Sequence, residues 1–127
     1  MDMDYDPSQL PNIDAVEVVE LKGILPNRVS EYMREAINAP TIRIDGEAAQ
    51  HIAHLWRQLP PGEQMRCHMP HFGLRFYAGG NLLLQASLCW DCNNIFINQG
   101  ELDLYFNFNG QHPLSRELLA LLKKTVS

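Results

Sequence analysis

Three cysteines are the residues of this chain with the most distinctive chemistry. Cys89 and Cys92 have C-x-x-C spacing in residues 88–94 (LCWDCNN), and Cys67 stands beside His68 in the run RCHMPH, which ends with His71. Thiolates and imidazoles are the ligands that tetrahedral zinc prefers. One interpretation is therefore a structural zinc site, with Cys67, Cys89 and Cys92 as ligands and His68 or His71 as the fourth.

Two other interpretations of the same residues stay open. Free cysteines are often buried and pack like small hydrophobic side chains. Alternatively, Cys67 or Cys89 could be a reactive thiol activated by His68 or His71, in an enzyme or a redox protein. The C-x-x-C pair here ends a predicted strand, so it lacks the helix dipole that lowers the thiol pKa in many redox motifs. We expect the cysteines to be mostly reduced, because their number is odd and no signal peptide is evident.

A predicted β-hairpin determines how these residues approach one another. Alternating apolar residues over 72–77 and 82–90 flank an Ala-Gly-Gly-Asn turn. If the turn is centred on Gly79 and Gly80, facing residues have numbers that sum to about 159. That register brings Cys67 opposite Cys92 and His68 opposite Asp91. Pro70 interrupts regular pairing, and a slip of one residue would turn Cys67 to the other face.

The rest of the chain predicts an α+β domain. Alternation continues through 95–98 and 102–108, so we expect a four-stranded antiparallel meander over about 72–108. One or two further strands (15–21 and 41–44) and two or three helices (27–39, 46–59 and one from Pro113) would pack with it. Residues 1–12 are expected to form a flexible acidic arm, and residues 13–127 a single α+β domain.

Composition and charge narrow the classes of function. Of the 127 residues, 46% are hydrophobic and 20% charged, which is typical of a folded globular protein. No long apolar run or signal peptide is evident, so we expect a cytoplasmic protein without a membrane partner. The net charge of -5 disfavours nucleic acid as a partner. Six acidic residues precede the first basic one: Asp2, Asp4, Asp6, Asp14, Glu17 and Glu20. They could bind a basic protein, or simply keep the segment hydrated.

The run RCHMPHFGLRFYAGGNLLLQASLCWDCNN also resembles a family of small uncharacterised bacterial proteins. Its pattern is Cys-x-x-Pro, Gly-Leu-x-Phe and Cys-aromatic-x-Cys-Asn, which Cys67, Gly73, Cys89, Trp90 and Cys92 match. The resemblance implies an α+β fold and a bacterial setting, but no reaction and no catalytic residue. Some small acidic proteins of this kind look like immunity proteins that neutralise a toxin.

The leading hypothesis is therefore a cytoplasmic protein-binding module, and its more specific form is an immunity protein that neutralises a basic toxin through its acidic surface. The alternatives are a thiol-dependent enzyme or redox protein, and a domain of another role held together by zinc.

Overall fold

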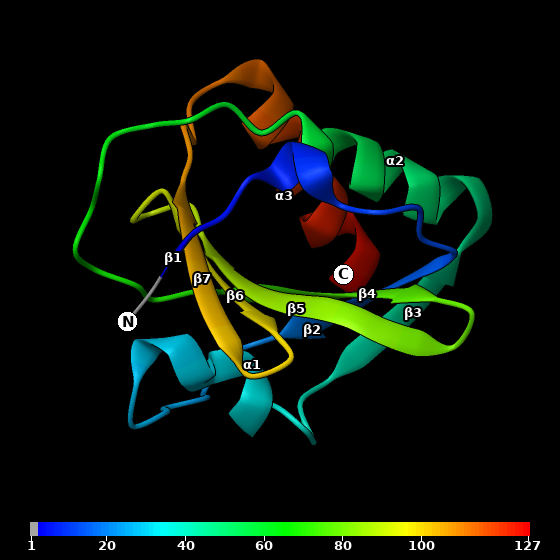
Figure 1. The fold of residues 1–127 in the computed structure, drawn as a ribbon, viewed down its shortest axis with the longest axis horizontal. Helices are drawn as coiled ribbons and strands as arrows, with labels where there is room; N and C mark the ends of the chain where they lie inside the picture. Colours follow the sequence, from blue (N-terminus) through cyan, green and yellow to red (C-terminus); the bar gives the residue numbers. More distant parts are fainter. Residues whose placement is uncertain (1–2) are drawn as a thin grey trace.

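A computed structural model describes residues 3–127 and has the α+β architecture that the sequence predicts. One sheet with the strand order β1-β7-β6-β5-β4-β2-β3 forms the middle layer. Figure 1 shows α2 and α3 on one side of this sheet and α1 on the other. None of the described helices has the length and apolar character needed to cross a membrane.

Four consecutive strands form the antiparallel meander: β4 (Phe72–Ala78), β5 (Asn81–Cys89), β6 (Asn94–Gln99) and β7 (Leu102–Asn107). Three further strands extend it, where one or two were predicted. On one side β4 pairs with β2 (Ala15–Glu20), which pairs with the edge strand β3 (Thr41–Asp45), both antiparallel. On the other side β1 (Met3–Asp4) pairs with β7 in parallel.

The predicted hairpin register is correct only next to the turn. Tyr77 pairs with Leu82 as expected, but Phe72 pairs with Leu88 instead of Ser87. The reason is an irregularity between Phe76 and Tyr77, where an extra residue on β5 shifts the pairing by one. Beyond this bulge, pairing deduced from the turn alone is therefore wrong by one residue.

Two long helices cover one face of the sheet and enclose the main core. Helix α2 (Gly46–Arg57) buries one stripe of its surface, including Ile52 and Trp56, against Phe76 and its neighbours. Helix α3 (Pro113–Val126) begins with a proline, and the side chain of His112 accepts a hydrogen bond from the Leu114 N–H. Lys123 and Lys124 stand in its last turn, where positive charge suits the helix dipole.

The helix predicted over 27–39 is much shorter in the structure. It consists of a 3-10 turn, η2 (Val29–Glu31), and the single α-helical turn α1 (Tyr32–Glu35). Met33 and Ala36 are buried here, whereas Val29 and Ile37 are 47% and 79% exposed. A longer helix would need a continuous buried stripe to stabilise it, and this segment does not provide one.

The N-terminal segment, expected to be a loose arm, packs against the domain over its described part. Asp2 lies outside the described residues. After β1 comes the 3-10 turn η1 (Pro7–Gln9), and Leu10 is buried in the main core. Tyr5 accepts a hydrogen bond from the Trp56 indole N–H at 3.1 Å, and Arg57 donates to the carbonyl of Leu10 at 3.0 Å.

Candidate functional site at the cysteine and histidine cluster

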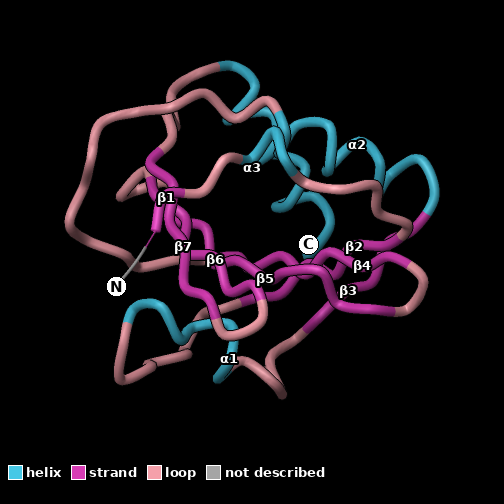
Figure 2. Tube along the Cα trace, in the orientation of Figure 1, coloured by secondary structure: helices cyan, strands magenta, loops and turns pink. Residues whose placement is uncertain are grey.

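The loop between α2 and β4, residues 58–71, brings Cys67 to the C-x-x-C turn. Figure 2 shows this loop leaving α2 on one side of the sheet and returning to β4 around the end of β7. There Gly62 donates a hydrogen bond to the carbonyl of Asn107 at 2.9 Å. Cys67 then forms a disulfide with Cys92, with 5.6 Å between the two Cα atoms. The predicted proximity of Cys67 and Cys92 is confirmed, but this loop produces it and not an extension of the β4–β5 ladder, which ends at Phe72. The expectation that the cysteines are mostly reduced differs from the disulfide in the structure.

The third cysteine lies in the same tight turn. Cys89 is fully buried, and its Sγ accepts a hydrogen bond from the backbone N–H of Cys92 at 3.1 Å. Asn93 follows with a φ of 52°, the left-handed region that asparagine tolerates better than most residues. The turn thus directs a backbone donor at the Cys89 sulfur. With Cys67 and Cys92 bonded to each other, the described residues contain no group of three or more His, Cys, Asp or Glu side chains placed to hold a metal.

His68 lies on the sheet face opposite α2 and α3, and both of its ring nitrogens are engaged there. Nδ1 lies 2.7 Å from Asn94 Oδ1, and Nε2 lies 2.8 Å from Ser87 Oγ. Asn94 Nδ2 donates to the carbonyl of Cys67 at 2.6 Å, so its Oδ1 must be the atom that faces the ring. Since Oδ1 can only accept, Nδ1 carries the proton and the Ser87 hydroxyl donates to Nε2.

This arrangement keeps His68 neutral. Burial lowers its pKa to about 4 because the charged ring would lose its hydration, and the hydrogen bond to Asn94 acts in the opposite direction. The rings of Tyr32 and Phe96 pack edge-on against the imidazole, with centroids 5.6 and 4.7 Å away. Hydrogen bonds and aromatic contacts therefore fix the loop to this face.

The chain Ser87–His68–Asn94 has the order of a nucleophile, a base and an orienting group. Ser87 is only 2% exposed and His68 only 5%, so no substrate reaches the hydroxyl in this conformation. His68 also engages Ser87 and Asn94 in place of a thiol. The predicted roles of His68 as a zinc ligand or as the activator of a cysteine therefore do not agree with its position.

His71, the other predicted ligand, is exposed and borders two adjoining hollows. The first encloses about 400 Å³, with Phe72, Trp90 and Leu119 among its apolar lining. The second is smaller, at about 210 Å³, and is lined by Leu25, Tyr32 and Met69 among others. Lys22 and His71 belong to both hollows, which adjoin at the end of the sheet where β2 ends and β4 begins, the first beside α3 and the second beside α1. We call this region the two-hollow surface.

Charges surround the first hollow in equal numbers of each sign. Glu20 and Asp91 are acidic, and Lys22 and Lys123 are basic. Within residues 3–127 none of these four side chains forms an ion pair. Trp90 is held in place by its indole N–H, which donates to the carbonyl of Ser115 at 3.1 Å.

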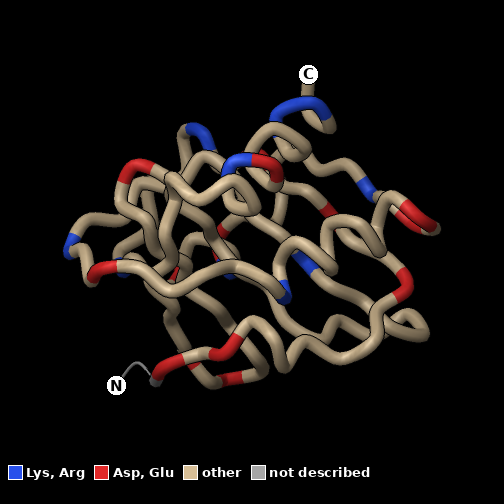
Figure 3. Tube along the Cα trace, turned by 90° about the horizontal axis from the view of Figure 1, so that it is seen from above, with Lys and Arg blue, Asp and Glu red and all other residues tan. Residues whose placement is uncertain are grey.

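The structure does not bring the predicted acidic residues together into one surface. Asp4, Asp6 and Asp14 are exposed, but Asp6 accepts hydrogen bonds from Ser8 and Asp14 accepts one from the N–H of Gly79. Glu17 and Glu20 point to opposite faces because they are three residues apart on one strand. Figure 3 shows acidic positions near the N-terminus and basic positions beside the C-terminus.

Glu17 is occupied by partners within the chain. It accepts a hydrogen bond from the Tyr77 hydroxyl at 2.6 Å and lies 3.7 Å from Arg75 and 3.9 Å from Arg43. Its charge is therefore largely balanced, and it contributes little to attracting a basic partner.

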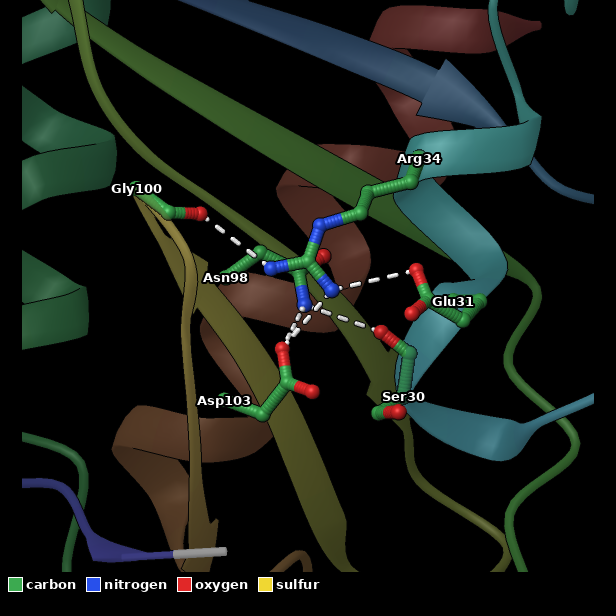
Figure 4. A network of polar contacts seen from close by, with 6 residues as sticks. All are labelled: Ser30, Glu31, Arg34, Asn98, Gly100 and Asp103. Atoms are coloured by element: carbon green, nitrogen blue, oxygen red, sulfur yellow. Dashed lines mark hydrogen bonds and ion pairs between the residues drawn. The ribbon is translucent and has the colours of Figure 1, made fainter.

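A second polar network anchors α1 to the same sheet face as His68. Figure 4 shows the Arg34 guanidinium between Glu31 and Asp103. It lies 3.0 Å from the Glu31 carboxylate and 2.8 Å from that of Asp103, and it donates a hydrogen bond to the carbonyl of Gly100. Asn98 is buried and donates to the carbonyl of Ser30 and to Asp103, both at 2.9 Å.

Sequence reasoning missed three residues that shape this region: Ser87, Asn94 and Lys22. Ser87 alternates with Ala86 and Leu88 and so was expected on the face away from the core, but nothing local identified His68 as its partner. No local pattern indicated that the side chain of Asn94 would bond to His68 either. Comparisons with protein-family models, with curated proteins and with solved structures gave no match to this chain. The family resemblance therefore stays a prediction, and the function must be argued from the geometry.

Proposed function

We propose that this protein is a protein-binding module and that its partner contacts the two-hollow surface. The observation that carries the proposal is that two apolar hollows adjoin and share Lys22 and His71. A partner could insert one large apolar side chain into the first hollow and a smaller one into the second. The charges around the first hollow would then pair with polar groups of the partner.

Exposed apolar side chains support this location. Leu25 is 89% exposed and Met69 71%, and both line the second hollow. Contiguous exposed apolar surface often marks a place where another molecule binds. Trp90 adds a half-buried indole, a side chain that is frequent among the residues that dominate binding energy.

The finer form of the proposal is an immunity protein that neutralises a basic bacterial toxin. Its support is the net charge of -5, to which the exposed Asp4, Asp6 and Asp14 contribute. Such charge would mainly accelerate association with a basic partner, while the apolar contacts would determine how slowly the complex dissociates. A cytoplasmic location is part of this proposal.

The alternative, a thiol-dependent enzyme or redox protein with Cys67, Cys89 and Cys92, has weaker support. His68 engages Ser87 and Asn94, so it is not available as the base that would activate a thiol.

The test is a photo-crosslinking residue at position 25, with the same residue at position 82 as the matched control. Leu82 is 47% exposed but lies at the β4–β5 turn, away from both hollows. A bacterial protein crosslinked only from position 25 would be purified and titrated by calorimetry against the wild type, Leu25→Asp and Leu82→Asp. We expect Leu25→Asp to weaken binding by about tenfold or more and Leu82→Asp to leave it nearly unchanged. Equal affinities would refute the two-hollow surface as the contact.

The immunity role needs a separate measurement. Expression of the purified partner's gene should stop bacterial growth, and co-expression of this protein should restore it. A triple variant Asp4→Asn, Asp6→Asn, Asp14→Asn should slow association at low salt more than the equally charged control Glu35→Gln, Glu47→Gln, Glu101→Gln. A partner that is harmless to cells, or association rates that are equal for both variants, would count against a toxin recognised through the N-terminal acids.

A further inference from the structure

We propose that Cys67, Cys89 and Cys92 form a redox-controlled metal site, in which reduction of the Cys67–Cys92 disulfide frees two thiols that join the free thiol of Cys89 in binding one zinc-class divalent ion. The juxtaposition that supports this is the disulfide between Cys67 and Cys92 together with the contact between Cys92 and Cys89. The proposal needs no protein partner, so it stands or falls separately from the proposed function.

The turn at 89–93 is already shaped to hold a metal-bound sulfur. The Cys92 N–H donates to Cys89 Sγ at 3.1 Å. Outer hydrogen bonds of this kind orient metal ligands. The left-handed Asn93 lets the chain reverse immediately after Cys92. Packing alone would not require a backbone donor to point at a buried sulfur.

Cys67 reaches the same place from a loop that is fixed independently of the disulfide. Asn94 donates to the Cys67 carbonyl, and the next residue, His68, is held by Asn94 and Ser87. Two sulfurs bound to one tetrahedral zinc at ~2.3 Å lie about 3.8 Å apart, against about 2.0 Å in a disulfide. Side-chain rotation can supply the difference of about 2 Å while both backbones stay in place.

The hydrogen bonds of His68 change the ligand set that the sequence predicts. His68 belongs to the support around the site, because both of its ring nitrogens have partners. The protein therefore supplies three sulfurs, and the fourth position of a tetrahedral ion is filled by His71 or by water.

Reduction of the disulfide and binding of the metal are two separate steps. A dithiol reductant attacks the disulfide, the Cys67–Cys92 sulfur–sulfur bond breaks, and the two electrons and two protons of the dithiol convert the pair to two thiols, while the dithiol becomes a disulfide. The ion then binds Cys67, Cys89 and Cys92 as thiolates, and three protons go to solvent. Both the disulfide and the metal tie residues 67–71 to the turn at 89–92.

The experiment is an anaerobic titration with Co²⁺ alone, which reports sulfur ligands through ligand-to-metal absorption in the near ultraviolet and tetrahedral geometry through its visible bands. The reduced wild-type protein should bind one ion per chain with both spectral features, and the oxidised protein should show neither. Cys89→Ala is the decisive variant, because Cys89 takes no part in the disulfide. Under reducing conditions it should lose the tetrahedral spectrum while its far-ultraviolet circular dichroism stays that of the wild type.

Alkylation of the unmutated protein tests the same idea if Cys89→Ala does not fold. After reduction, intact mass after treatment with iodoacetamide should show three modified thiols in chelator, and protection of all three when Zn²⁺ is added before the reagent. A reduced protein that binds no Co²⁺, a Cys89→Ala variant with the wild-type spectrum, or zinc that protects only two thiols would overturn the proposed site.

Discussion

The sheet face that carries α2 and α3 is held by buried apolar area, whereas the opposite face is covered by two segments held mainly through polar bonds. Trp56, Phe76 and Ile52 belong to one continuous apolar cluster on the first face. On the second face a small cluster around Met33 and Ala36 is supplemented by the Arg34 network, the His68 network and the disulfide.

This difference determines what each face responds to. Apolar burial depends little on pH, ionic strength or reductant. Ion pairs weaken with salt, a buried histidine responds to acid, and a disulfide responds to reductant. We therefore expect the first face to set the overall stability and the second face to open under milder conditions.

The largest effect should come from the helical face. Trp56→Ala would remove a fully buried indole and its hydrogen bond to Tyr5, at a cost of about 3–5 kcal/mol in the free energy of unfolding. The measurement is urea denaturation followed by circular dichroism. His54→Ala, at an exposed position of the same helix, should change stability by less than about 0.5 kcal/mol. A small loss of stability for Trp56→Ala would mean that the core repacks to fill the space of the missing ring.

Reduction tests the opposite face. Cys67 and Cys92 are 25 residues apart in sequence, and opening a loop of that size should lower the free energy of unfolding by about 3 kcal/mol in chelator. Hydrogen exchange should then rise in residues 62–71 before it rises in α2. Hydrogen exchange that rises equally in both segments would show that the two faces unfold as one unit. It would contradict the expectation that the second face opens under milder conditions than the first.

Acid should weaken the same face through His68. The unfolded histidine titrates near 6.5 and the folded one near 4, so the unfolded chain binds more protons between these values. The stabilisation is complete above about pH 6.5 and is lost as the pH falls towards 4, with a total of at most about 3 kcal/mol. Urea denaturation midpoints of the wild type and of His68→Gln at pH 7, 5.5 and 4.5 would measure this loss of stability. If the midpoints of the two proteins changed with pH in parallel, the role of His68 in acid sensitivity would be contradicted.

Arg34 should have the smallest measurable effect of these groups. Arg34→Met removes two ion pairs and the bond to Gly100, and should cost about 1 kcal/mol, less at high salt. The matched control is Glu117→Gln, which removes an exposed pair with His51 and should cost about 0–0.5 kcal/mol. If urea denaturation showed the same loss in the free energy of unfolding for both variants, partial burial would add nothing to the stability that the Arg34 network provides.

Particular residues show how far sequence reasoning reached. The alternation of Phe72, Leu74 and Phe76 predicted β4 and its buried face correctly, because side chains on a strand alternate with a period of two. The stripe through Ile52 and Leu55 likewise predicted α2. The segment 27–39 was predicted as a long helix because its apolar spacing suits one, but only Met33 and Ala36 of this segment are fully buried.

Local periodicity and turn chemistry in the sequence were sufficient to predict an α+β domain and its central antiparallel hairpin. The tertiary structure alone decided the bulge at Phe76 and Tyr77, the disulfide, the two partners of His68 and the meeting of Lys22, His71 and Trp90 at the two-hollow surface. The physical reason is that periodicity reports which face a side chain occupies. Which side chain it meets there depends on register shifts of single residues and on loops whose paths are set by contacts far away in the sequence.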